Sequence, residues 1–183
     1  GLSNDPEAPI CPCKIFPVSY FYYGFALKPE YLLRAPVEQN LNDANFDPLV
    51  SIDGGFKSKL TELLLQGAIG GVLTLYDRDM SYTHADFGAT TVYRLREGIE
   101  RFFITDINNP AASAQAQSEL PIMHDMLAST IVMDGATVAN HVPGGGNVLF
   151  MDGHVEFVRY PGIWPICASW SVAMGNPVVL LGG

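Results

Sequence analysis

The chain has 183 residues, of which 48% are apolar and only 16% are charged. This composition predicts one folded domain with a sizeable core and excludes an intrinsically disordered chain. The formal net charge of −9 argues against nucleic acid and anionic membranes as main partners, because both require a basic surface. With 18 glycines and 13 prolines, many turns and loops are expected.

The two ends of the chain have distinctive compositions. Residues 1–17 contain four prolines, which predict an extended N-terminal segment rather than a helix. Residues 163–183 form an almost uncharged, apolar C-terminal tail, which we expect to be buried against another surface. No run of about twenty apolar residues is present, so we expect no membrane segment in this chain.

The apolar pattern predicts several elements in the first half. Residues 18–27 are rich in aromatic side chains and predict a strand, and residues 29–34 predict a short helix. Residues 35–55 are rich in Asn and Asp and predict a loop. Residues 56–66 predict an amphipathic helix, because their apolar residues recur at helical spacing. A short strand is expected at residues 72–76.

A polar loop over residues 77–86 and a strand over residues 90–96 are expected next. Residues 98–105 fit either a helical turn or a short strand. Residues 110–119 predict a helix that begins at a proline, and residues 120–124 predict a strand. Together these elements predict an α+β fold: a small single domain with a central antiparallel sheet, one amphipathic helix and many loops.

The strongest local signal is Asp152-Gly153, which lies between two apolar runs in residues 147–158. An Asp-Gly pair between such runs predicts a hairpin with a two-residue type I′ turn. That turn would pair Phe150 with Val155, and would place Val148, Phe150, Val155 and Phe157 on one apolar face. Residues 140–146, just upstream, predict a flexible approach without regular structure.

The three cysteines are Cys11, Cys13 and Cys167, too few for a four-ligand structural zinc site. Two interpretations stay open. One is a single disulfide from Cys167 to Cys11 or Cys13, and the other is three free thiols.

Acidic residues of the 77–86 stretch provide the candidate metal site. Asp77, Asp79 and Asp86 supply oxygen ligands of the kind that calcium prefers, so calcium is a possible cofactor. The spacing does not match an EF-hand, and Arg78 could pair with its acidic neighbours. A solvated acidic loop is therefore the preferred interpretation, and a calcium site is the alternative.

The histidines do not predict a catalytic site. His84, His124, His141 and His154 are scattered, and none has the spacing of a metalloprotease motif. His141 and Asp152 suggest acid–base chemistry, but the better interpretation is that His141 bonds to the loop backbone and that the turn itself prefers Asp at position 152. We therefore expect no enzymatic activity and no catalytic residues.

Three stretches carry a resemblance to a known family: residues 93–110, residues 118–125 and Asn140-His-Val-Pro-Gly-Gly-Gly-Asn-Val-Leu-Phe-Met-Asp-Gly-His-Val155. They resemble the bacterial prepilin-type, pseudopilin-like family, whose C-terminal module carries a His, about nine residues, then Asp-Gly. Here ten residues separate His141 from Asp152, and the N-terminal pilin helix of that family is not found in this chain.

The resemblance implies an α+β head with an antiparallel sheet, no enzymatic chemistry and, often, a loop that binds calcium. The expected function is a structural subunit of an extracellular or cell-surface pilus-like filament, a helical homo-oligomer. Without the pilin helix, we expect the terminal segments 1–17 and 163–183 to make the contacts between subunits, by adding strands to a neighbour's sheet edge. The tail is the better candidate because it contains Trp164 and Trp170.

The alternative function is a minor pseudopilin or surface adhesin head that binds a partner or a carbohydrate. Its binding face would be the aromatic strand with Tyr20, Tyr22 and Tyr23.

Overall fold

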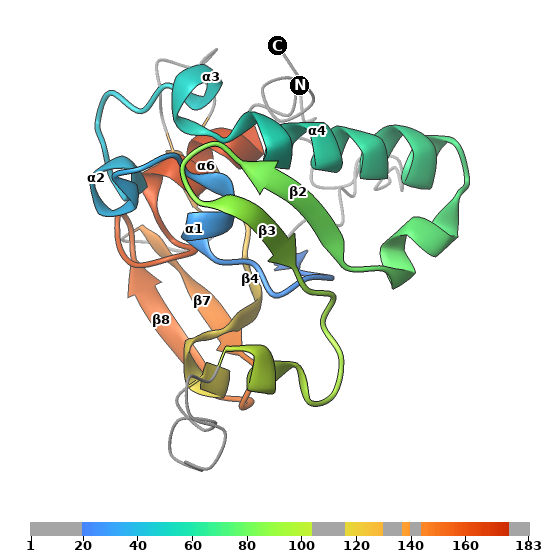
Figure 1. Cartoon of the computed structure of the whole chain (residues 1–183). Helices are drawn as coiled ribbons and strands as arrows, with labels where there is room; N and C mark the ends of the chain where they lie inside the picture. The colour runs from blue at the N-terminus through green and yellow to red at the C-terminus, as the bar shows by residue number, and fades with distance from the viewer. Residues whose placement is uncertain (1–19, 104–115, 130–136, 140–143, 176–183) are drawn as a thin grey trace, which may run out of the picture.

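The computed structural model describes residues 20–103, 116–129, 137–139 and 144–175. It has the expected α+β fold, in which the main sheet is antiparallel and has four strands. Figure 1 shows this sheet on one side of the molecule, and the helix α4 with the β2–β3 hairpin on the other side.

The strands are short, and every pair is antiparallel. In chain order they are β1 (Tyr20–Tyr22), β2 (Met80–His84), β3 (Gly88–Val92), β4 (Pro121–Asp125), β5 (Leu127–Ser129), β6 (Thr137–Ala139), β7 (Gly145–Phe150) and β8 (Val155–Arg159). The main sheet has the order β1-β4-β7-β8, while β2 pairs with β3 and β5 pairs with β6. Among the described strands, β1 and β8 are therefore the edges of the main sheet.

The helices are also short, and more numerous than the sequence predicts. They are α1 (Pro29–Leu32), α2 (Val37–Leu41), α3 (Pro48–Ser51), α4 (Gly54–Glu62), the π-helix η2 (Leu63–Ile69), the 3₁₀-helices η3 (Leu73–Asp77) and η4 (Ile99–Phe102), and α6 (Ala168–Gly175). Residues 116–119 are helical too. The expected strand at 72–76 is wrong, because these residues lie mostly in η3, and the expected loop at 35–55 contains α2 and α3.

The hairpin of β7 and β8 forms, but with a different register from the predicted one. Leu149 pairs with Val155, and the amide of Phe150 donates to the carbonyl of His154 at 3.0 Å. Three residues, 151–153, therefore form the loop, and Gly153 has a φ of +91°. This is the pattern of a three-residue hairpin loop with a glycine at positive φ, so the type I′ turn is wrong.

A shift of one residue moves side chains to the opposite face of a strand. Val148 and Phe150 are buried as expected, and they pack with Val158 of β8. Val155 and Phe157 lie on the outer face instead, 60% and 47% exposed. The upstream stretch also differs from the expectation, because Gly145 and Gly146 already belong to β7.

The C-terminal tail is part of the core as far as the structure describes it. Ile166, Cys167, Trp170 and Ala173 are all at most 3% exposed. Trp170 packs in the largest buried cluster, with Tyr23 of the first strand segment and Phe56 of α4. The prediction that residues 163–183 make the contacts between subunits is therefore wrong for these buried residues. Residues 176–183 lie outside the described residues, as does the N-terminal segment 1–17.

Cys167 is buried and has no disulfide partner among the described residues. Cys11 and Cys13 lie outside them, so the two interpretations of the cysteines both remain predictions. In the part of the chain that the structure describes, no helix is both long and apolar enough to cross a membrane.

Candidate functional site

The acidic stretch 77–86 is not a loop, because its middle forms strand β2. Burial alternates along this strand, with Met80 and His84 buried and Ser81 and Thr83 exposed. Asp79 precedes β2 and Asp86 follows it, so the strand alone separates them by roughly 13 Å. The structure therefore does not bring Asp77, Asp79 and Asp86 to one position.

Each of these carboxylates pairs with an arginine. Asp77 lies 3.2 Å from Arg94 and Asp79 lies 3.1 Å from Arg96. Asp79 also accepts a hydrogen bond from the backbone amide of Arg94 at 2.8 Å. These contacts connect the start of β2 to the residues that follow β3. Among the described residues, no cluster of three or more potential metal-ligating side chains occurs.

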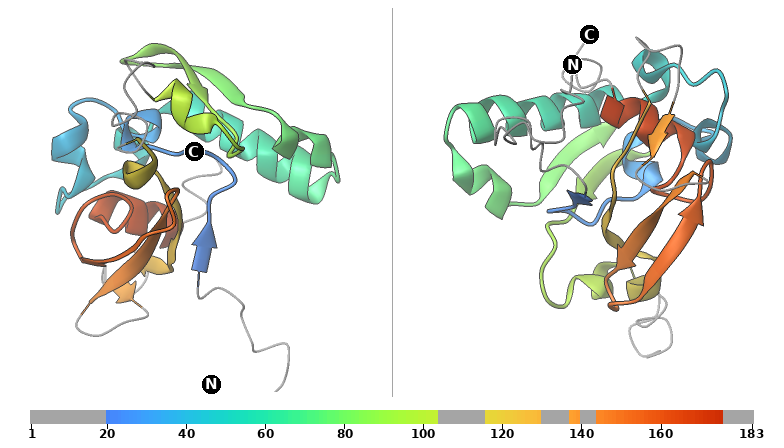
Figure 2. Two further views of the ribbon diagram at one scale, coloured as in Figure 1. Left: turned by 90° about the horizontal axis from the view of Figure 1, so that it is seen from below. Right: turned by 180° about the vertical axis from the view of Figure 1, so that it is seen from behind.

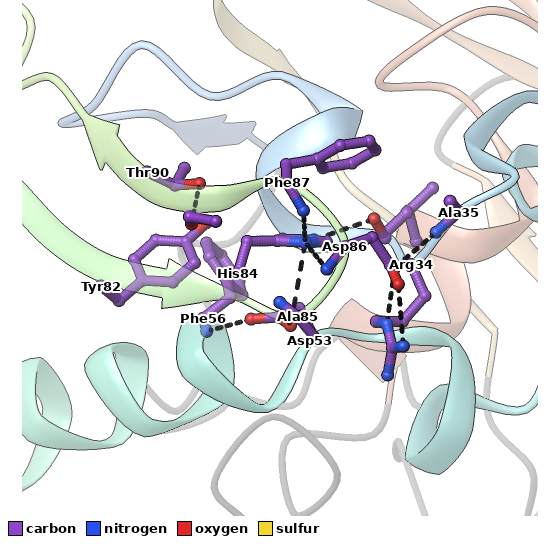
Figure 3. Close-up of polar contacts among 12 residues, drawn as sticks. Arg34, Ala35, Asp53, Phe56, Tyr82, His84, Ala85, Asp86, Phe87 and Thr90 are labelled. Carbon is purple, nitrogen blue, oxygen red and sulfur yellow. Dashed lines mark hydrogen bonds and ion pairs between the residues drawn. The ribbon is translucent and has the colours of Figure 1, made fainter.

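Asp86 and Arg34 form a bidentate pair, shown in Figure 3. The Arg34 Nε and Nη2 atoms donate to the two carboxylate oxygens at 2.7 and 2.9 Å, and the amide of Ala35 donates at 2.9 Å. These donors hold the pKa of Asp86 well below its usual range, with the Arg34 guanidinium as the main cause. The pair fastens the β2–β3 turn to the segment after α1.

Asp53 and His84, which are both buried, lie beside that pair (Figure 3). One Asp53 oxygen accepts the amide of Phe56 and caps α4, and the other accepts the amide of Ala85 at 2.9 Å. His84 Nε2 lies 3.1 Å from the carbonyl of Leu33, while its Nδ1 accepts the amide of Asp86. These partners assign the neutral tautomer with the proton on Nε2, and they use both ring nitrogens to hold backbone.

Asp152 and His154 also interact within a turn. One Asp152 oxygen accepts the amide of His154 at 3.0 Å and lies 2.5 Å from its Nδ1. These hydrogen bonds, chiefly that of the amide, lower the pKa of Asp152. Asp152 thus stabilises the hairpin loop, as the turn-based interpretation predicts. His141 lies outside the described residues.

The feature that sequence reasoning missed is an exposed apolar tip, which we define as Leu65, Ile69, Val72 and Leu73. Ile69 and Leu73 are 78% and 67% exposed, and the other two are also exposed. Figures 1 and 2 place the connection from α4 through η2 to η3 at one end of the molecule, away from β7 and β8. The uninterrupted apolar runs 63–65 and 72–73, separated by glycines, were the available signal in the sequence.

The tip has a defined internal structure. The hydroxyl of Tyr76 in η3 donates to the carbonyl of Leu63 in η2 at 2.9 Å. Gly67 allows this packing, because a Cβ there would lie only 2.7 Å from the Tyr76 ring. Gly71 then reverses the chain at a φ of +73°. Four large aliphatic side chains within nine residues are thus held outward on an ordered support, which is typical of a contact surface for another protein.

A second exposed surface belongs to β1. Tyr20 and Tyr22 are exposed, whereas Phe21 is half-buried and Tyr23 is buried. Of the three tyrosines expected on a binding face, the structure therefore places two together on the surface and one in the core. β1 pairs with β4 alone among the described strands.

Comparison with known proteins finds no match: no family model, no curated protein and no solved structure is similar to this chain.

Proposed function

We propose that the chain is a structural subunit of an extracellular or cell-surface filament, with a pilin-like head that assembles into a helical homo-oligomer. The observation that carries this proposal is the apolar tip. Buried against a neighbouring subunit, it would gain about 25 cal/mol for each Å² of apolar surface removed from water. A patch that contacts a different surface of the next copy makes a heterologous contact, and repeated heterologous contacts produce a helical polymer unless they close into a ring.

The fold also supports the proposal. An α+β fold with a small antiparallel sheet is the fold that the resemblance to pseudopilin-like proteins implies. Residues 1–17 and 176–183 are proposed to make additional contacts between subunits. The proposal no longer includes the tail residues that are buried in the chain's own core.

Electron microscopy and sedimentation of the purified chain test this function. The proposal expects filaments or concentration-dependent oligomers. A chain that sediments as a monomer at every concentration up to the millimolar range would overturn it.

A second candidate is a minor pseudopilin or adhesin head, which the exposed Tyr20 and Tyr22 favour. Exposed tyrosines on an edge strand offer stacking faces and hydroxyl groups to a carbohydrate or a peptide. Glycan-array binding that is lost in Tyr20→Ala with Tyr22→Ala would favour this candidate. Tyr23→Phe is unsuitable as the probe of this surface, because Tyr23 lies in the core.

A further inference from the structure

An apolar cavity of about 320 Å³ lies between the β1 segment, α4 with η2, η3 and α6. Among the described residues, its walls are aromatic or aliphatic side chains, with Gly24 as the exception. They include Phe21, Phe56, Leu60, Met80, Trp170 and Met174. Tyr22 and Leu64 also line it and are exposed, so the cavity opens to solvent beside them.

Four side chains that line the cavity carry a polar atom, and three of those atoms are accounted for. The Tyr76 hydroxyl donates to the carbonyl of Leu63, and the Trp170 indole donates to His124 Nε2 at 3.1 Å. Tyr22 is exposed to water. The fourth, the Tyr23 hydroxyl, is buried and has no hydrogen-bond partner in the described part of the chain. Because Trp170 has a single N–H and already uses it, it cannot supply the missing bond.

A buried hydroxyl without a partner destabilises a fold, and such groups are rare. The Tyr23 hydroxyl has almost no accessible surface, so it is the ring of Tyr23 and not its oxygen that faces the cavity. Burial raises the pKa of Tyr23 well above its ordinary value, so the hydroxyl stays protonated. The cavity therefore presents an almost wholly apolar surface.

We propose that this cavity binds an uncharged apolar molecule, either an alkyl chain or a ring system. A cavity of roughly 150 Å³ lined by aliphatic and aromatic groups holds benzene, so this one accommodates roughly twice as many carbon atoms, about twelve. The described lining contains no cationic side chain, which disfavours a free carboxylate inside the cavity. This site is independent of the proposed assembly of the chain.

Titration with 1-naphthylamine tests the site directly, because this uncharged dye has fewer carbon atoms than the cavity accommodates and its fluorescence changes in dry surroundings. Gly24→Leu places a side chain at the cavity wall, where a Cβ meets no atom within 4 Å. Gly54→Leu is the matched control, because a Cβ there also meets no atom within 4 Å and Gly54 does not line the cavity. We expect saturable binding by the wild type, at least tenfold weaker binding by Gly24→Leu and unchanged binding by the control. A wild type that does not bind the dye, or equal binding by both variants, overturns the proposal.

The chain's own C-terminal residues are the rival occupant, since Met174 lines the cavity and residues 176–183 follow it closely. Deleting residues 176–183 distinguishes a separate ligand from these C-terminal residues as the occupant. Dye binding of similar affinity with and without these residues supports a separate ligand. Binding that occurs only after the deletion shows that the cavity is reserved for the tail, and overturns the ligand proposal.

Discussion

The indole Nε1 of Trp170 donates a hydrogen bond to Nε2 of His124 at 3.1 Å, and both side chains are buried. The other ring nitrogen of His124, Nδ1, lies 2.6 Å from the carbonyl of Asp125. His124 is therefore neutral, with its proton on Nδ1 and its Nε2 as the acceptor. This bond connects α6, near the end of the described chain, to β4 in the main sheet.

Stability should consequently decrease as the pH falls below about 6.5, the ordinary pKa of histidine. Burial lowers the pKa of His124 in the folded state, so the unfolded chain binds more protons between that lowered pKa and about 6.5. The contribution of neutral His124 to the free energy of unfolding is complete above this pH window and is lost as the pH falls through the window. Denaturant melts of the wild type and His124→Gln at several pH values measure how steeply the free energy of unfolding changes with pH. Since Gln retains an acceptor but does not titrate, parallel slopes in the two proteins would contradict the assignment.

Replacing Gly153 with Val should destabilise the hairpin by about 1–3 kcal/mol, because a β-branched residue is strained at positive φ. A Cβ at Gly153 meets no atom within 4 Å, so the loss is conformational rather than steric. Thermal melting measures it. Gly153→Asn is the matched control, since Asn tolerates positive φ and should retain most of the stability. Identical melting of all three proteins would disprove the three-residue loop with Gly153 at positive φ.

Truncation of the tail should have two different outcomes. Deleting residues 171–183 removes buried Ala173, and also Ser171, whose hydroxyl lies 3.1 Å from that of Tyr160, so we expect the protein to unfold. Deleting residues 176–183 leaves α6 complete, and we expect a folded protein. Circular dichroism melts distinguish these cases. A cooperative, wild-type melt of the longer deletion would show that α6 is not part of the core.

Calcium should change the melting temperature little. Asp77, Asp79 and Asp86 each have an arginine within ion-pair distance, and a cation would have to replace those partners. Melting with millimolar calcium and with a chelator checks this. A calcium-dependent increase that disappears in Asp77→Asn with Asp79→Asn would instead support the site predicted from the sequence.

Elements with strong local signals could be predicted from the sequence. Pro29 at the first position of α1 and the helical spacing around Phe56 indicated their helices, and the apolar runs around Asp152 indicated the β7–β8 hairpin. The hairpin register could not be predicted, because an Asp-Gly pair suits loops of two or three residues. Tertiary packing decides it, since only Val158 of β8 enters the core.

Two other features depended on context that the sequence does not display. Asp77, Asp79 and Asp86 made the stretch around β2 resemble a loop, although burial alternates along Met80–His84. Helix α6 lacks a polar face, so its apolar sequence resembled a tail that needed a partner. The apolar tip was hidden for the opposite reason, because the run around Leu65 and Leu73 resembled ordinary core residues.

Sedimentation velocity of Ile69→Lys with Leu73→Lys tests the central claim, that the apolar tip mediates assembly, most directly. Both side chains are exposed, so the substitutions should leave the melting temperature unchanged. Val50→Lys is the matched control, because Val50 is 70% exposed and lies on α3, outside the tip. We expect the wild type and the control to form concentration-dependent oligomers and the double variant to sediment as a folded monomer. Oligomers of the double variant equal to those of the wild type would contradict the claim.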